Sequence, residues 1–130
     1  MIYLQFLKYL FDELLLNLRK RFQKFKLLKT FPTSKIAQNV TIKSTQNLML
    51  KENVQIQQGC FLHCGGMKWC YYKGLIKIGK NSVISPRCIF YGCGPGGIEI
   101  GDNFDCGPGV KIFSSRTDYK NKGKHVFAPV

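Results

Sequence analysis

Two histidines, His63 and His125, are the side chains of this sequence best suited to proton transfer near neutral pH. A neutral imidazole can accept a proton at physiological pH, so each is a candidate general base. His125 lies in the basic run KNKGKHVF, which follows Asp118, and a carboxylate near an imidazole can orient it. We expect His125 and Asp118 to form a catalytic pair, and the alternative is an ordinary surface-loop histidine.

Cysteine is the other reactive side chain that is frequent here. The six cysteines are Cys60, Cys64, Cys70, Cys88, Cys93 and Cys106. They include no Cys-x-x-Cys spacing, and the histidines are not spaced as zinc ligands, so we expect no metal site. Since no secretory signal is found, a reducing, cytoplasmic compartment is expected. Small buried residues with free thiols are therefore the prediction.

An aromatic and basic stretch, KWCYYKGLIK at 68–77, is a candidate ligand-binding loop. Trp69, Tyr71 and Tyr72 could stack on a sugar or a nucleotide, with Lys68 and Lys73 close by. The alternative is that these aromatic side chains shield the fold or meet a neighbouring subunit. We expect Trp69 and Tyr71 to contact substrate.

The elements that must position these residues follow a six-residue repeat. Three stretches align without gaps, namely LKENVQIQQGCFLHCGGM from Leu50, IGKNSVISPRCIFYGCGP from Ile78 and IGDNFDCGPGVKIFSSRT from Ile100. The opening group of each has asparagine in its fourth position, at Asn53, Asn81 and Asn103. A partial copy starts at Ile36, with Asn39 in the same place. A period of this length is typical of stacked β coils.

A period of six fits a short strand and a tight turn, with one aliphatic side chain per unit pointing inward. Three units close a coil, and successive coils stack through parallel hydrogen bonds. Asparagine suits a left-handed corner. We expect Cys60, Cys88 and Val110 to lie over one another and Cys106 to point inward. His63 should point outward into solvent.

Residues 1–31 have a different character, because every glycine and proline lies later than residue 31. Apolar residues recur at helical spacing from Leu4 to Leu28, and Arg21 is the one interruption. We predict one helix over residues 3–29, ended by Pro32. Its apolar stripe could pack against protein, or the helix could lie peripherally on the inner face of a membrane, near anionic headgroups.

The net charge of +13 favours an anionic partner. No apolar run approaches the ~20 residues of a membrane span. No known nucleic-acid-binding motif is found, so nucleic acid is an unlikely partner, and the charge alone does not choose between acidic lipid and a phosphorylated small molecule.

The phrases IKIGKNSVISPRCIFYG and IEIGDNFDCGPGVKIFSS resemble the hexapeptide-repeat acyltransferases, and the bacterial sugar O-acetyltransferases are the most similar. The resemblance covers residues 36–118 and implies a left-handed parallel β-helix. It also implies acetyl transfer from acetyl-CoA as co-substrate, a sugar or surface-polysaccharide acceptor, and a homotrimer with sites between stacks.

The resemblance includes departures at the expected site. Thr117 stands where many members have the catalytic histidine, while Ser114, Ser115, Asp118 and Tyr119 fit a Ser-Ser-x-x-Asp-Tyr variant. Ser85 and Cys93 stand where acceptor-binding Asn and Asp are frequent. We expect Ser85, Ser114 and Ser115 to contact the substrate.

Residues 119–130 are expected to form a loop that leads toward further coils, so a C-terminally truncated, inactive chain is one expectation. The domain assignment is therefore a helix at 1–31, coils at 36–118 with an excursion at 68–77, and this final loop. Two alternatives to an enzyme remain: a non-catalytic β-helix scaffold and a membrane-surface interaction protein.

Overall fold

The computed structural model describes residues 1–117 and 127–129. It contains two compact units, Met1–Pro32 and Thr33–Val130. The first holds the helix α1, and the second holds all the strands.

Helix α1 spans Ile2–Thr30 and confirms the helix predicted over 3–29. It ends with two capping hydrogen bonds: the Thr30 hydroxyl donates to the Lys26 carbonyl at 2.9 Å, and the Phe31 N–H donates to the Leu27 carbonyl at 2.8 Å. Pro32 then has no N–H with which to continue the ladder. Within the part of the chain that the structure describes, no helix has the length and apolar character needed to cross a membrane.

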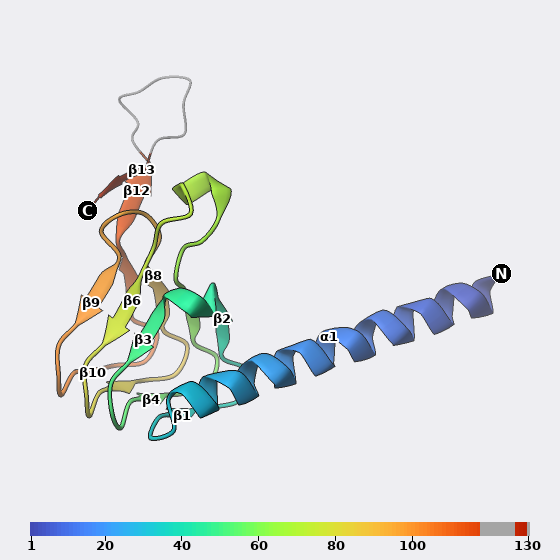
Figure 1. The fold of residues 1–130 in the computed structure, drawn as a ribbon, viewed down its shortest axis with the longest axis horizontal. Coiled ribbons are helices and arrows are strands. Elements are labelled where there is room, and N and C mark those ends of the chain that lie inside the picture. The colour runs from blue at the N-terminus through green and yellow to red at the C-terminus, as the bar shows by residue number, and fades with distance from the viewer. Residues whose placement is uncertain (118–126, 130) are drawn as a thin grey trace. The chain divides into compact units, whose positions relative to one another are not determined.

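Three parallel sheets form the second unit. Sheet 1 contains β1 (Lys35–Ile36), β4 (Gln55–Ile56), β7 (Val83–Ile84) and β10 (Asp105–Cys106). Sheet 2 contains β2 (Thr41–Lys43), β5 (Phe61–His63), β8 (Ile89–Tyr91) and β11 (Lys111–Phe113). Sheet 3 contains β3 (Leu48–Leu50), β6 (Ile76–Ile78) and β9 (Ile98–Ile100), which lie side by side in Figure 1.

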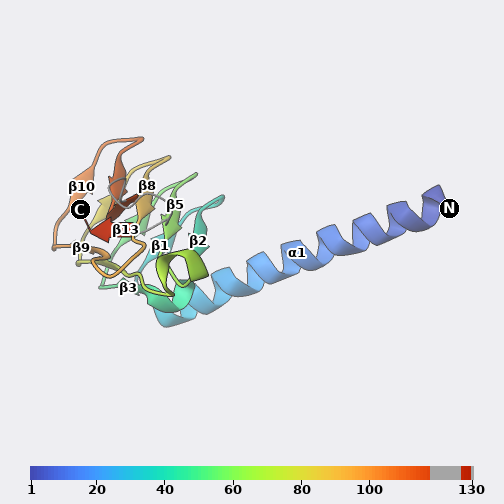
Figure 2. The same cartoon turned by 90° about the horizontal axis from the view of Figure 1, so that it is seen from above.

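The chain visits the three sheets in turn, which is the arrangement of a parallel β-helix. Every strand in sheets 1 to 3 pairs in parallel with the equivalent strand of an adjacent coil. Seen from above, the coils follow one another in chain order (Figure 2). An antiparallel pair, β12 (Ser115–Thr117) with β13 (Phe127–Pro129), follows the last coil.

The interior of the coils is a column of apolar, mostly aliphatic side chains from all three sheets. Ile56, Leu62, Ile78 and Phe90 are each at most 1% exposed. Burial of such side chains is the main favourable contribution to the stability of the stack.

The predicted stacking of the small residues is confirmed. The amide after Cys60 donates to the Cys88 carbonyl, and the amide after Cys88 donates to the Val110 carbonyl, both at 2.9 Å. Cys106 pairs with Ile84 and is buried, as expected for an inward position.

The asparagine corners are also confirmed. Asn53, Asn81 and Asn103 have φ angles of 57°, 56° and 58°, in the left-handed region. Their amide groups form a ladder, in which Asn53 Nδ2 donates to Asn81 Oδ1 at 3.2 Å and Asn81 Nδ2 to Asn103 Oδ1 at 3.5 Å.

Two details of the predicted repeat are wrong. Ile36 pairs with Ile56 rather than with Leu50, so Asn39 lies at the corner of Gly59, Arg87 and Gly109. The predicted excursion at 68–77 is shorter at its end, because Ile76 and Lys77 belong to β6 and pair with β3. Counting hexads from the asparagines therefore placed the start of this coil too late.

Candidate functional site

The connections between sheets differ sharply in regularity. Sheet 2 is joined to sheet 3 by residues 44–47, 64–75 and 92–97, which differ in length and which we call the variable corner. The other two corners repeat with constant length, and we call them the regular corners. They comprise residues 37–40, 57–60, 85–88 and 107–110, and residues 51–54, 79–82 and 101–104. Insertions on a rigid stack are where binding residues are expected.

The longest insertion, 64–75, is held on both sides by its neighbours. Asn47 Nδ2 donates to the Cys64 carbonyl at 3.1 Å, and the Ser44 hydroxyl donates to the Gly65 carbonyl. On the other side, the Gly94 N–H donates to the Lys73 carbonyl at 3.0 Å. The insertion contains a short helix, η2 (Lys68–Cys70), that carries Trp69. The position of Trp69 is therefore fixed by hydrogen bonds to the preceding and the following coil.

Glycines allow this close packing of backbone on backbone. A Cβ at Gly65, whose φ is +78°, would meet the Lys73 carbonyl oxygen and lie 2.5 Å from the Cα of Gly74. A Cβ at Gly92 would lie 2.5 Å from the Leu75 carbonyl oxygen. No other residue type fits these two positions without moving the loop.

His63 is buried, so the prediction of a solvated outward histidine is wrong. Its side chain leaves the outer side of β5, as the repeat predicted, but only 2% of the residue is exposed. The rings of Trp69 and Tyr91 lie 5.5 Å and 4.8 Å from the His63 ring, measured between centroids. The insertion that carries Trp69 therefore covers a position that the strand alone would leave open.

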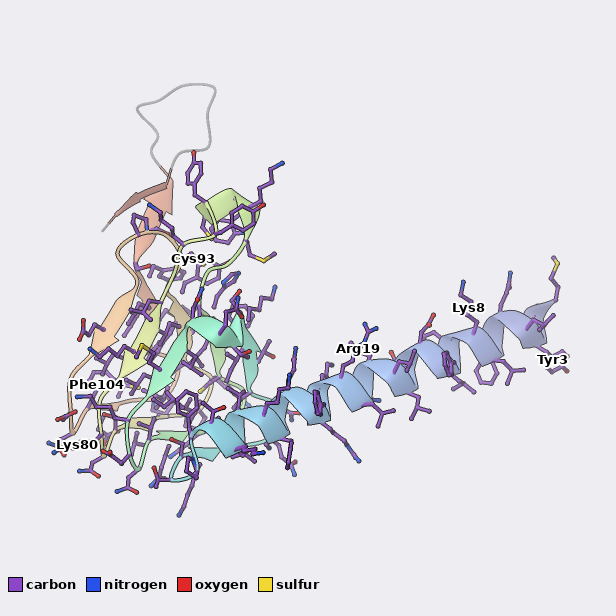
Figure 3. All side chains as sticks on the ribbon, in the orientation of Figure 1. Tyr3, Lys8, Arg19, Lys80, Cys93 and Phe104 are labelled. Carbon is purple, nitrogen blue, oxygen red and sulfur yellow. The ribbon has the colours of Figure 1, made fainter. Side chains whose placement is uncertain are left out.

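His63 also makes two polar contacts under this cover. The Gly65 N–H donates to His63 Nδ1 at 3.2 Å, and the Cys93 Sγ lies 3.1 Å from the same nitrogen. Cys93 is labelled in Figure 3, on the side of the coils that carries η2. Because Nδ1 accepts a hydrogen bond from the backbone, the neutral ring carries its proton on Nε2.

The pKa shifts of His63 and Cys93 favour the neutral form of both side chains. Burial lowers the pKa of His63, and the positive charge of Lys43 lowers it further. Burial raises the pKa of the Cys93 thiol to about 12, with Cys70 as the next cause. A reactive Cys–His pair needs the opposite shifts, toward thiolate and imidazolium. We therefore assign this contact to packing and not to nucleophilic catalysis.

The outer side of sheet 2 carries a row of ring side chains, which we call the aromatic face. It consists of Phe61, His63, Trp69, Tyr91 and Phe113. The Tyr91 ring stands at its centre, with centroids 6.1 Å from Trp69, 6.1 Å from Phe61 and 5.9 Å from Phe113. Such offset ring pairs are each worth about 0.5–1.5 kcal/mol beyond area burial.

Part of the aromatic face is open to solvent. Trp69 is 36% exposed and Phe113 is 51% exposed. The ammonium group of Lys43 lies 5.7 Å from the Phe61 ring centroid, so a cation borders the face. A flat apolar surface next to a positive charge can pack against the ring of a sugar and attract an anionic group on the same molecule.

The structure brings only some of the predicted substrate residues to this region. Trp69 belongs to the aromatic face, whereas Tyr71 follows η2 and is 63% exposed. Ser114 is buried, and its hydroxyl is 2.7 Å from the Cys93 carbonyl and 3.2 Å from the Tyr91 carbonyl. Ser115 follows it and is half-buried. Ser85 lies at a regular corner, away from Trp69 along the coil.

The predicted base and its carboxylate, His125 and Asp118, lie outside the described residues, as does Tyr119. The strands on either side of them are described, and Thr117 pairs with Phe127.

Tyr91, Phe61 and Phe113 were missed from the sequence as binding residues. A signal for two of them was present, because His63, Tyr91 and Phe113 occupy the same position in successive coils. Three ring side chains in one outward column mark an aromatic row, since outward positions of the same column stack on one another.

The described residues hold no cluster of histidine, cysteine and carboxylate side chains able to bind a metal ion. All six cysteines are free thiols and buried, as predicted. Comparison with protein-family models, with curated proteins and with solved structures finds no match to this chain.

Proposed function

We propose that this protein is an acetyl-CoA-dependent O-acetyltransferase that acts on a sugar or surface polysaccharide, on a left-handed β-helix that assembles as a homotrimer. One observation supports the proposal above the others. The six-residue repeat folds into stacked parallel coils with left-handed asparagine corners, which is the architecture that the acyltransferase resemblance implies. Because one fold serves several functions, the chemistry has to come from particular residues.

The reaction needs a base near the acceptor. The acceptor oxygen attacks the thioester carbonyl, a C–O bond forms and the C–S bond breaks, and the base passes the hydroxyl proton to the departing thiolate. We assign the base to His125 and its orientation to Asp118. The assignment rests on the chemistry of an imidazole with a carboxylate partner, because both residues lie outside the described residues.

The aromatic face is the proposed acceptor-binding surface. Trp69 and Tyr91 offer partly open rings whose planes differ by 25°, and apolar faces of sugar rings pack on such surfaces. Ser114 cannot take part through its hydroxyl proton, which the backbone carbonyls of Tyr91 and Cys93 already accept. Among the serines proposed for substrate contact, Ser115 remains the better candidate.

A second candidate function is a non-catalytic scaffold that binds carbohydrate. Thr117 favours it, because threonine cannot act as the base at that position. Such a protein would bind a saccharide on the aromatic face and would transfer no acetyl group.

The test combines a binding and a turnover measurement. We expect calorimetry to detect binding of acetyl-CoA, and mass spectrometry to detect acetylated oligosaccharide after incubation with both substrates. His125→Gln and Asp118→Asn should abolish transfer while acetyl-CoA still binds. A protein that binds no acetyl-CoA would rule out the enzyme. Saccharide binding without any transfer would select the scaffold.

The aromatic face is tested separately by a matched pair of variants. Trp69→Ala removes a ring from the face and should weaken saccharide affinity about tenfold or more. Tyr72→Ala removes a ring that is 67% exposed and belongs to no described ring contact of the face, so it should change affinity little. Equal effects of the two substitutions would reject the aromatic face as the binding surface.

A further inference from the structure

Helix α1 has an apolar face that the unit Met1–Pro32 does not itself cover. It consists of Tyr3, Leu4, Leu7, Leu10, Phe11, Leu14, Leu15, Leu18, Phe22 and Phe25. On an α-helix these positions cover an arc of about 140°, and the face runs from the first turn to the second-last. Phe11, Leu14 and Leu18 are 59%, 56% and 53% exposed. A face of this area, open to water, calls for a partner.

The charges of the same helix identify the kind of partner. The acidic residues, Asp12 and Glu13, both lie in the first half. Residues 14–30 contain no acidic residue and six basic ones: Arg19, Lys20, Arg21, Lys24, Lys26 and Lys29. Figure 3 shows Lys8 and Arg19 on one side of α1 and Tyr3 on the other, as the helical period requires.

These observations disfavour a second copy of α1 as the partner. A coiled-coil seam needs a narrow stripe of apolar residues, and this arc is wider. Two or three such helices packed in parallel would also bring their unbalanced basic halves together, and like charges repel. An anionic surface avoids both difficulties, because it is flat and carries the opposite charge.

We infer that α1 lies along an anionic lipid surface, with its apolar face among the acyl chains and its basic side chains at the headgroups. Lysine and arginine at the margins of the face can extend their charged ends toward the headgroups, which also accommodates Arg21 within the stripe. The absence of any membrane-crossing helix from the described residues agrees with a helix that lies in the interface. This inference is independent of the proposed acetyl transfer.

The experiment is flotation of the whole chain with two kinds of vesicle, phosphatidylcholine alone and phosphatidylcholine with phosphatidylserine. We expect at least about tenfold stronger binding to the anionic vesicles, and a steep loss of that binding as salt is raised. Binding to neither vesicle, or equal and salt-insensitive binding to both, would overturn the inference.

Leucines on opposite sides of α1 test the apolar face. The double substitution Leu14→Gln with Leu18→Gln places amides in the face. We expect it to weaken binding to the anionic vesicles about tenfold or more. Leu16→Gln introduces the same side chain on the opposite side of the helix, at 47% exposure, and should leave vesicle binding unchanged. Equal effects at the two sites would contradict the orientation that we infer.

Two further experiments test the role of the basic side chains and the alternative of self-association. Replacing Arg19, Lys20 and Lys26 by glutamine should lower the affinity for anionic vesicles and flatten its salt dependence. Analytical ultracentrifugation of the leucine variants distinguishes the other partner. If Leu14→Gln with Leu18→Gln dissociates an oligomer while the wild-type chain ignores vesicles, the face belongs to a second copy and the lipid inference is wrong.

Discussion

The regular and the variable corners of the coils both lead the chain from one sheet to the next, but they do so with different structures. At the regular corners, a left-handed residue, which is asparagine or glycine except at Arg87, turns the chain within a constant length, and each corner stacks on its equivalent. At the variable corner, insertions of unequal length are held to one another by hydrogen bonds, and the longest of them brings Trp69 onto the outer side of sheet 2. The regular corners therefore provide repetition, and the variable corner provides a distinct local surface.

This difference has consequences for substitution. At a regular corner the cost of a change is mainly the conformation of one residue, whereas at the variable corner it includes contacts with two neighbouring segments. Glycine positions with similar conformations but different surroundings can separate these two costs.

The largest expected effect is at the variable corner, in Gly65→Ala. The alanine would have to adopt a left-handed backbone conformation, and its Cβ would collide with the backbone of Lys73 and Gly74. We expect a loss of about 3 kcal/mol or more in the free energy of unfolding, measured by urea denaturation. Gly109→Ala, at φ +73° with open space around it, should cost only about 1 kcal/mol.

Gly101→Ala is the reference for this series. Its backbone is not left-handed and a Cβ there meets no atom within 4 Å, so we expect a change within about 0.5 kcal/mol. Similar losses for Gly65→Ala and Gly109→Ala would mean that backbone conformation, and not the packing of the insertion, governs the variable corner.

The same contrast explains what could be predicted from the sequence. The regular corner that joins sheet 3 to sheet 1 was predictable, because Asn53, Asn81 and Asn103 recur at a fixed position, and a short-range conformational preference determines their structure. The long apolar stripe without glycine or proline likewise predicted α1 to within one residue at each end.

The variable corner was not predictable to the same degree. The repeat correctly assigned His63 to the outer side of its strand, but a periodicity does not describe what an insertion does after it leaves the coil. Burial of His63 results from Trp69, which follows it within that insertion, and from Tyr91 of the next coil. The polar contact between His63 and Cys93 has the same origin, since it joins residues of different coils.

The next prediction concerns a regular corner, where Asn81 combines a left-handed backbone with a central place in the asparagine ladder. Asn81→Ala should lower the free energy of unfolding by about 1–2 kcal/mol, through the strained φ and the lost hydrogen bonds. Asn81→Gly keeps the backbone conformation, so it should lower the free energy of unfolding by less than Asn81→Ala does. The same urea denaturation measures both variants. An Asn81→Gly variant no more stable than Asn81→Ala would assign the effect to the ladder alone.

The smallest expected effect is the pH dependence due to His63, which directly precedes the longest insertion of the variable corner. Its pKa is lowered in the folded chain by burial and by Lys43, so the folded state favours the neutral ring. The stability due to this preference is present above the unfolded pKa, about 6.5, and is lost as pH falls toward the folded value. The neighbouring groups, the Cys93 thiol and the Tyr91 hydroxyl, have raised pKa values and stay neutral throughout this range.

Comparing the wild-type chain with His63→Gln at each pH isolates this contribution, because titration of His125 and of the carboxylates is common to both proteins. The difference in their free energies of unfolding should be constant above neutral pH. Below about pH 6.5 it should shrink, with a slope of at most about 1.4 kcal/mol per pH unit. A difference that stays constant down to pH 5 would show that His63 accepts a proton without penalty, and the cover formed by Trp69 and Tyr91 would then be open to water. A closed cover over His63 makes the strand end next to the variable corner sensitive to pH, whereas the regular corners contain no histidine.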